Sequence, residues 1–130
     1  MNFLIVEDNL INRMVLQSLL EPVTKNLAFA ENGAEALEAV EAGTGTGFQL
    51  ILMDINMPVM DGVTATKEIR KYETHHGLPP TPIIAVTAHD DDEHRVACQS
   101  AGMDGFVAKP INADVLFNSI NNHADTAMPA

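Results

Sequence analysis

The sequence predicts an α/β fold in which a doubly wound parallel sheet of five strands lies between two layers of helices. Two observations lead to this prediction. Five short runs are almost continuously apolar, as expected for strands buried on both faces of a sheet; they are residues 3–6, 27–30, 48–53, 82–86 and 105–108. Helical stretches alternate with these runs, and that alternation favours a parallel sheet with right-handed crossovers.

Five helices are predicted, one after each strand. They are a stretch from residue 9 to Pro22, residues 34–42, residues 62–72, a stretch that ends near residue 101 and a last helix that follows Asn112. Acidic residues 90–93 suit the positive end of the fourth helix dipole. Asn112 is a capping residue, and Ile111 and Leu116 have the spacing of a hydrophobic staple. Two connections are predicted to be loops, the glycine-rich residues 43–47 and the polar residues 73–80.

The composition indicates a single ordered domain. The chain has 130 residues, of which 46% are hydrophobic, and a chain of this length can bury a substantial core. We expect residues 1–124 to form the domain and residues 125–130 to form a flexible tail. The formal net charge is −11, from 7 Lys and Arg against 18 Asp and Glu. Because nucleic-acid binding depends on cations that neutralise phosphates, we expect no direct nucleic-acid partner; acidity fits a cation partner, or it only keeps the domain dispersed.

The sequence also predicts a cytoplasmic location without membrane insertion. Its apolar runs are too short to cross a bilayer, and no basic segment precedes the N-terminal apolar stretch as in a signal peptide. The single cysteine, Cys98, excludes an intrachain disulfide. Cys98 is expected to be a small buried residue of the fourth helix.

Polar residues follow the apolar strands at the points where the strands end. Glu7 and Asp8 follow the first strand, Asp54 the third, Thr87 the fourth and Lys109 the fifth. In a parallel doubly wound sheet the carboxyl ends of the strands share one edge, and ligands bind beyond that edge. We therefore expect these five residues to lie together.

Three carboxylates at one edge repel one another unless a cation lies between them. Mg²⁺ prefers oxygen ligands and uses one or two carboxylates together with water or phosphate oxygens. No His or Cys stands at the spacing of a Zn²⁺ site, and no EF-hand loop is present, although charge alone does not exclude Ca²⁺. With Lys109 as a cation and Thr87 as a hydroxyl donor, the set suits phosphoryl transfer to Asp54.

Each of these residues also has an ordinary structural explanation. Glu7 and Asp8 could cap the helix that follows them, and Asp54 could be a turn residue. Thr87 could be a plain strand-end threonine, and Lys109 a solvated surface lysine. It is the combination of all five that favours a functional site.

At this point a family resemblance is recognisable. Four segments together resemble the receiver domain of two-component response regulators, in order and over essentially the whole chain. They are Val6-Glu7-Asp8-Asn9 with Asn12-Arg13, Met53-Asp54 with Met57-Pro58 and Met60-Asp61-Gly62, Thr87-Ala88, and Lys109-Pro110. The first three, with His89, are more similar to receivers attached to hybrid histidine kinases. The resemblance implies a flavodoxin-like sheet with the strand order 2-1-3-4-5.

The resemblance implies a role for each residue of the metal and acceptor site. Asp54 corresponds to the phosphorylated aspartate, and Lys109 to its charge partner. Asp8 corresponds to a direct Mg²⁺ ligand, with Glu7 acting through water. Asn56 corresponds to the position whose backbone carbonyl completes the metal site.

The resemblance also implies a switch. Thr87 and Phe106 correspond to the pair in which the hydroxyl moves to the phosphoryl group and the ring turns inward. Phe106 has no hydroxyl, so its switch would work by packing alone, or the ring could be static core. Lys109–Pro110 corresponds to a cis peptide bond. Asn56 and His89 correspond to positions that tune dephosphorylation, or they are simply exposed polar residues.

The implied function is a phosphorylation switch and not a turnover enzyme. A histidine kinase or a histidine phosphotransfer domain would supply the phosphoryl group, and a downstream protein would bind the face formed by the fourth helix, the fifth strand and the fifth helix. One alternative is a phosphatase that forms an aspartyl phosphate, although such enzymes place an Asp-x-Asp pair after the first strand. Another is a degenerate receiver that acts by protein contacts alone. The expected location is also cytoplasmic if this receiver is part of a membrane-associated hybrid kinase.

Overall fold

The chain forms one parallel sheet, and its topology confirms the predicted fold. The computed structural model describes residues 2–23, 26–42, 48–55, 60–87, 92–109 and 111–123. The strands are β1 (Asn2–Val6), β2 (Asn26–Ala30), β3 (Leu50–Asp54), β4 (Ile83–Thr87) and β5 (Gly105–Ala108). All neighbouring strands are parallel, in the order β2-β1-β3-β4-β5. The order reverses between β1 and β3, so the crevice beyond their carboxyl ends is the expected ligand position.

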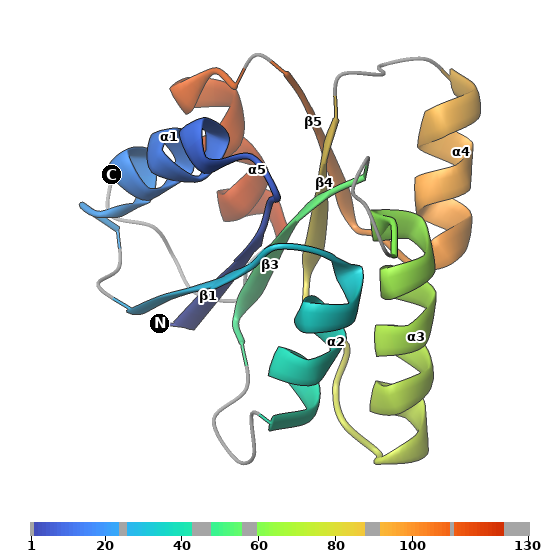
Figure 1. Cartoon of the computed structure of the whole chain (residues 1–130). Helices are drawn as coiled ribbons and strands as arrows, with labels where there is room; N and C mark the ends of the chain where they lie inside the picture. The colour runs from blue at the N-terminus through green and yellow to red at the C-terminus, as the bar shows by residue number, and fades with distance from the viewer. Residues whose placement is uncertain are drawn as a thin grey trace.

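Helices cover both faces of the sheet (Figure 1). They are α1 (Leu10–Leu20), α2 (Gly33–Ala42), α3 (Gly62–His75), α4 (Asp92–Ala101) and α5 (Ala113–His123). One face carries α1 and α5, and the other carries α2, α3 and α4 (Figure 1). None of the helices in the described ranges is long and apolar enough to cross a membrane.

Side-chain caps fix where four helices begin; in α2 the Asn32 side chain accepts from the N–H of Glu35 at 2.9 Å. The Asn9 side chain accepts a hydrogen bond from the backbone N–H of Asn12 at 3.0 Å and starts α1. The Asp61 side chain accepts from the N–H of Thr64 at 2.8 Å and starts α3. Asn112 accepts from the first turn of α5, as the sequence predicted. Each cap satisfies backbone donors that have no partner inside the helix.

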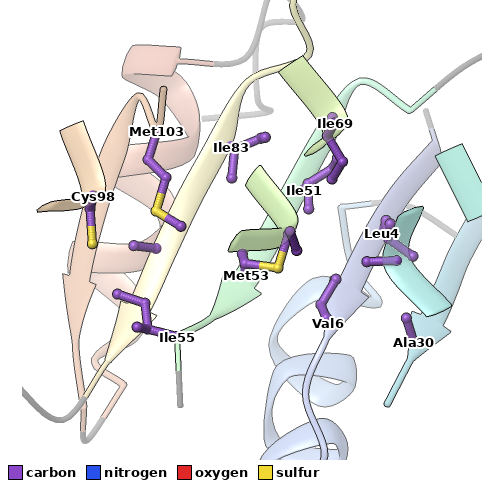
Figure 2. Close-up of a cluster of buried hydrophobic side chains, with 13 residues drawn as sticks. Leu4, Val6, Ala30, Ile51, Met53, Ile55, Ile69, Ile83, Cys98 and Met103 are labelled. Carbon is purple, nitrogen blue, oxygen red and sulfur yellow. The ribbon is translucent and has the colours of Figure 1, made fainter. Parts of the chain in front are cut away.

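Alternation along the strands divides the core into two clusters. In β3, Leu50 and Leu52 pack with α1 and α5, whereas Ile51 and Met53 pack with α2, α3 and α4. This is the period of two that a strand imposes on its side chains. Figure 2 shows the second cluster, in which strand residues meet Ile69 and Cys98 from the helices. Cys98 is buried there, as predicted.

The predicted boundaries hold to within two residues, except at the end of α3. The structure extends α3 to His75, although residues 73–80 were predicted to be a loop. The reason is that Glu73 is buried and ion-paired: Arg70 Nη1 lies 2.7 Å from its Oε1, and the Thr81 N–H donates to its Oε2 at 2.7 Å. Composition alone could not reveal this buried pair. The helix ends before Gly77, whose φ of +65° suits a residue without a side chain.

Candidate functional site

Three carboxylates meet at the carboxyl edge of the sheet, where the sequence predicted them. Carboxylate oxygens of Glu7, Asp8 and Asp54 all lie within 4.8 Å of one another. Glu7 and Asp54 are almost completely buried, with 1% and 3% of their surface exposed, whereas Asp8 is exposed. Asp54 is the last residue of β3, and Glu7 and Asp8 lie between β1 and α1. The cluster therefore has a buried floor and an open side.

The strand alternation explains why the charged side chains converge. Phe3 and Ile5 of β1 pack on the α1 and α5 side, and Glu7 continues that series. Leu50 and Leu52 lead in the same way to Asp54, and Val107 of β5 leads to Lys109. Because residues two apart in a strand share a face, Glu7, Asp54 and Lys109 are directed to the same side of the sheet edge.

Lys109 supplies positive charge to the cluster. Its Nζ lies 3.3 Å from Asp54 Oδ2 and 3.5 Å from Glu7 Oε2. Its backbone N–H donates to the carbonyl of Thr87 at 2.7 Å, which ties the end of β5 to the end of β4. Lys109 is therefore not a solvated surface lysine, and the ordinary structural explanation for it is wrong.

The two oxygens of Glu7 have different surroundings. Oε1 accepts hydrogen bonds from the Asn9 N–H at 3.3 Å and from Asn12 Nδ2 at 3.1 Å. Oε2 is buried and accepts no hydrogen bond in the described part of the chain, and Lys109 is its charge partner at 3.5 Å. Asn9 caps α1, so the helix start does not require Glu7 or Asp8 as its cap. A buried carboxylate oxygen of this kind requires a donor or a cation.

Crowding perturbs Asp54 strongly. Burial, together with the adjacent Glu7 carboxyl, raises the pKa of Asp54 from its ordinary 3.8 to about 6, and Lys109 opposes that rise only in part. The causes are desolvation and like charge, the two effects that disfavour a charged carboxylate. A carboxylate perturbed by both burial and specific charge partners at a sheet edge is a candidate functional group.

The cluster fits a hard divalent cation. Within the described residues, all the candidate metal ligands are carboxylate oxygens. One of these oxygens is buried and accepts no hydrogen bond there, and the three carboxylates share the single ammonium group of Lys109. Oxygen ligands with an open side for water are the surroundings that Mg²⁺ prefers. In the part of the chain that the structure describes, no His or Cys joins the group, which argues against Zn²⁺.

Of the predicted switch residues, Thr87 lies at the same edge, Phe106 lies two register positions before it, and both belong to the other face of the sheet. Thr87, the last residue of β4, is completely buried and continues the series of Ile83 and Ala85, which pack on the α3 and α4 side. Phe106 is paired in register with Ala85, is half-buried and packs on that same side. The guanidinium carbon of Arg95 in α4 lies 4.9 Å from the Phe106 ring centroid. Thr87 and Phe106 thus share a face, as a coupled pair requires.

Some of the predicted positions cannot be compared, and some contributors were missed. Asn56, His89 and Pro110 lie outside the described residues, so the carbonyl ligand and the cis peptide bond remain predictions. Asn12 was quoted as part of a sequence pattern, but its hydrogen bond to Glu7 was not anticipated. Gly62 was likewise quoted in a sequence pattern, but its close approach was not anticipated: a Cβ there would lie 2.5 Å from the Asp54 carbonyl oxygen. Only glycine allows α3 to start so close to the site.

The comparisons with known proteins now identify the family. The sequence profile of the response regulator receiver domain matches residues 3–121 of the chain. The chain belongs to this family. Its five-stranded parallel sheet and five helices are those of the flavodoxin-like receiver fold.

The chain is similar both to a part of hybrid histidine kinases and to the receiver domain of a response regulator. It is 42% identical over 115 residues to hybrid signal transduction histidine kinase M of Dictyostelium discoideum, covering 88% of this chain and 5% of that protein. The Saccharomyces cerevisiae Ssk1 receiver domain, solved with the histidine phosphotransfer protein Ypd1, has a TM-score of 0.88 and 33% identity, covering 95% of this chain and 88% of that one.

A further solved structure bears on the metal. The receiver domain of sensor histidine kinase PA1611 from Pseudomonas aeruginosa, with a magnesium ion coordinated in its active site cleft, has a TM-score of 0.81 and 33% identity. That similarity covers 94% of this chain and 95% of that one. The chain spans only 5% to 14% of the length of the curated kinases that it matches.

The raised pKa of Asp54 predicts how stability depends on pH without metal. The folded state keeps the Asp54 proton up to about pH 6, whereas an ordinary carboxyl loses it near 3.8. Folding is therefore favoured below this window, and the free energy of unfolding falls as pH rises through it. Asp54→Asn should remove this fall, a difference on the order of 2–3 kcal/mol between pH 4 and pH 7.

The measurement is urea denaturation at a series of pH values in the presence of EDTA. Glu38→Gln, which alters an exposed carboxylate on α2, is the matched control and should leave the pH profile unchanged. If the parent and Asp54→Asn had parallel profiles, the crowding of Asp54 would be disproved.

Proposed function

We propose that this receiver domain works in a two-component phosphorelay by accepting a phosphoryl group on Asp54, with Mg²⁺ as its cofactor. The observation that carries the proposal is the position of Asp54: a buried carboxylate at a strand end, beside two further carboxylates and 3.3 Å from an ammonium group. Family membership supports it, because the chain matches receiver domains of histidine kinases.

The chemistry is the transfer of a phosphoryl group between two nucleophiles. A carboxylate oxygen of Asp54 forms a bond to phosphorus while the bond from phosphorus to the donor breaks, and its electron pair leaves with the donor. With a pKa of about 6, Asp54 is largely ionised at neutral pH and available as the nucleophile. Lys109 would hold its ammonium against the charge that collects on the phosphoryl oxygens.

The metal ligands in this proposal are the carboxylates of Asp8 and Asp54, with Glu7 acting through water and the backbone carbonyl of Asn56 completing the set. Bound Mg²⁺ would supply positive charge that offsets the carboxylates and the phosphoryl oxygens. Asn12 and the N–H of Asn9 would hold Glu7 in place, since both donate to its Oε1.

The output in this proposal is a shift between two conformations, read on the face formed by α4, β5 and α5. Thr87 would donate its hydroxyl to the phosphoryl group, and Phe106 would turn inward by packing alone. A partner surface there is supported by Val96 and Val115, which are 59% and 51% exposed. On this proposal the domain is a switch and not a turnover enzyme, and steady hydrolysis of a phosphate ester would instead favour the phosphatase alternative.

The phosphoryl donor would be a histidine kinase or a histidine phosphotransfer domain that docks on α1. Four large apolar side chains of α1 are 42% to 71% exposed on one face of the helix: Leu10, Ile11, Met14 and Val15. An apolar surface of this kind marks a protein contact, and α1 begins three residues after Glu7. The solved complex of a similar receiver with a histidine phosphotransfer protein supports such a donor. We place the reaction in the cytoplasm, where an unpaired Cys98 is expected.

Acetyl phosphate should phosphorylate the purified chain in the presence of Mg²⁺. Intact-mass spectrometry should show the gain of one phosphoryl group, and Asp54→Asn should abolish it because the nucleophile is lost. Asp61→Asn is the control: it changes a nearby carboxylate but keeps a good helix cap on α3, so it should be phosphorylated normally. Undiminished phosphorylation of Asp54→Asn would refute the assignment.

Mg²⁺ should raise the melting temperature of the chain, because a ligand that binds only the folded state stabilises it. At a concentration about a hundred times its Kd the stabilisation is about 2.7 kcal/mol. Asp8→Asn should reduce the shift strongly, whereas Asp114→Asn, an exposed carboxylate of α5, should not. Differential scanning calorimetry with and without Mg²⁺ measures this. No shift in the parent chain would favour the degenerate receiver instead.

Substitutions on α1 should slow phosphoryl transfer from a protein donor but not from a small-molecule donor. The double variant Ile11→Gln, Met14→Gln should slow transfer from a phosphorylated histidine phosphotransfer domain at least about tenfold, because apolar surface buried on docking is lost. Its phosphorylation by acetyl phosphate should not change. Val115→Gln, a similarly exposed apolar residue of α5, is the control. Equal slowing with both donors would mean that α1 acts through the site and not through docking.

A further inference from the structure

Positive charge is gathered in one groove of this acidic protein. The groove lies between α3 and α4, has a volume of about 610 Å³ and is lined by Lys67, Arg70, Lys71, Thr74, His75 and Ser100, with Ala101 at its end. The whole chain has only seven Lys and Arg against eighteen Asp and Glu. Three of the seven line this groove, and among the described residues no carboxylate lines it.

Helix stability does not explain this arrangement. Lys67, Lys71 and His75 are spaced four residues apart on one face of α3, and like charges at that spacing destabilise a helix. A basic residue in the last turn of a helix complements its dipole, but in α3 only His75 lies there. Lys67 therefore stands where neither the dipole nor an ion pair within the helix explains it, and Lys71 gains only its exposed pair with Glu68.

Internal ion pairs neutralise Arg70, so the positive charge available in the groove comes from the two lysines. Arg70 is held in place: its Nε and Nη2 donate to the Gly102 carbonyl, and it pairs with Glu73 and Asp104. Lys71 lies 3.4 Å from Glu68, but its side chain is 76% exposed, and such pairs are weak. Lys67 is exposed and has no ion pair within the part of the chain that the structure describes.

We propose that the groove between α3 and α4 binds an acidic peptide segment of a partner protein. Its length favours a peptide: from Lys67 to His75 the helix rises about 12 Å, which an extended chain of about four residues would span. The hydroxyls of Thr74 and Ser100 supply donors for carboxylates or backbone carbonyls. Outside the groove the sequence has only four Lys and Arg against eighteen Asp and Glu, so repulsion elsewhere would direct an acidic segment to this groove.

The groove is separate from the site at Asp54. Gly62, at the start of α3, approaches the Asp54 carbonyl, and His75 lies thirteen residues later, about 20 Å along the helix. Helix α1 lies on the opposite face of the sheet (Figure 1). A partner in the groove therefore leaves both Asp54 and α1 accessible.

Fluorescence anisotropy with a labelled, glutamate-rich octapeptide tests the proposal at low and physiological salt. The parent chain should bind this peptide more tightly than a lysine-rich peptide of equal length, and salt should weaken the binding. Lys67→Gln, Lys71→Gln should weaken it about three- to tenfold. Amide shifts on binding should fall on residues 67–75 and 100–101 and not around Asp54.

The matched control has the same net charge as the double lysine variant, but its charge changes lie on the opposite face of the sheet. Gln17→Glu, Asn118→Asp alters exposed residues of α1 and α5 on the opposite face and should leave binding within about twofold of the parent. Equal weakening in both double variants would overturn the proposal, because net charge alone would then explain the binding. Binding of an oligothymidylate in preference to the acidic peptide would overturn it as well.

Discussion

The structure depends on one electrostatic constraint, the crowding of carboxylates at a buried sheet edge. Glu7 and Asp54 are almost fully buried beside Asp8, and Lys109 is the cation that pairs with two of them. Three carboxylates against one ammonium leave negative charge that burial makes costly, and the raised pKa of Asp54 is the direct result. Added positive charge would lower the repulsion among these carboxylates, so the fold favours the binding of a cation at this site.

The fold can tolerate this constraint because the surrounding sheet is apolar and continuous. The central strands β3 and β4 are buried along their whole length, so the polar edge is set on a rigid base. Gly62 lets α3 begin against the Asp54 carbonyl, and Asn12 of α1 holds Glu7 from the other side. The two helices that start next to the site therefore fix its carboxylates from both faces of the sheet.

The sequence was sufficient to predict the sheet and the positions of most of the site residues, and the reason is physical. Strands buried on both faces must be apolar throughout, and parallel strands bring their carboxyl ends together, so Glu7, Asp8, Asp54, Thr87 and Lys109 could be placed at one edge. Pairings across the fold were not accessible in this way. The hydrogen bond from the Thr81 N–H to Glu73, the Arg70–Asp104 pair and the close approach at Gly62 depend on packing that no local pattern encodes.

The arrangement also suggests how a change at Asp54 reaches the opposite face of the sheet. Asp54 is paired in register with Val86, and both belong to the series that faces α1 and α5. Thr87, the next residue in β4, belongs to the series that faces α3 and α4, and Phe106 stands beside Ala85 in that same series. Val86, which is paired with Asp54, and Thr87, which faces α4, are therefore consecutive residues of the same strand. Adjacent residues of β4 thus face the two sides of the sheet, which supports the proposed coupling of Asp54 to the α4 face through this strand.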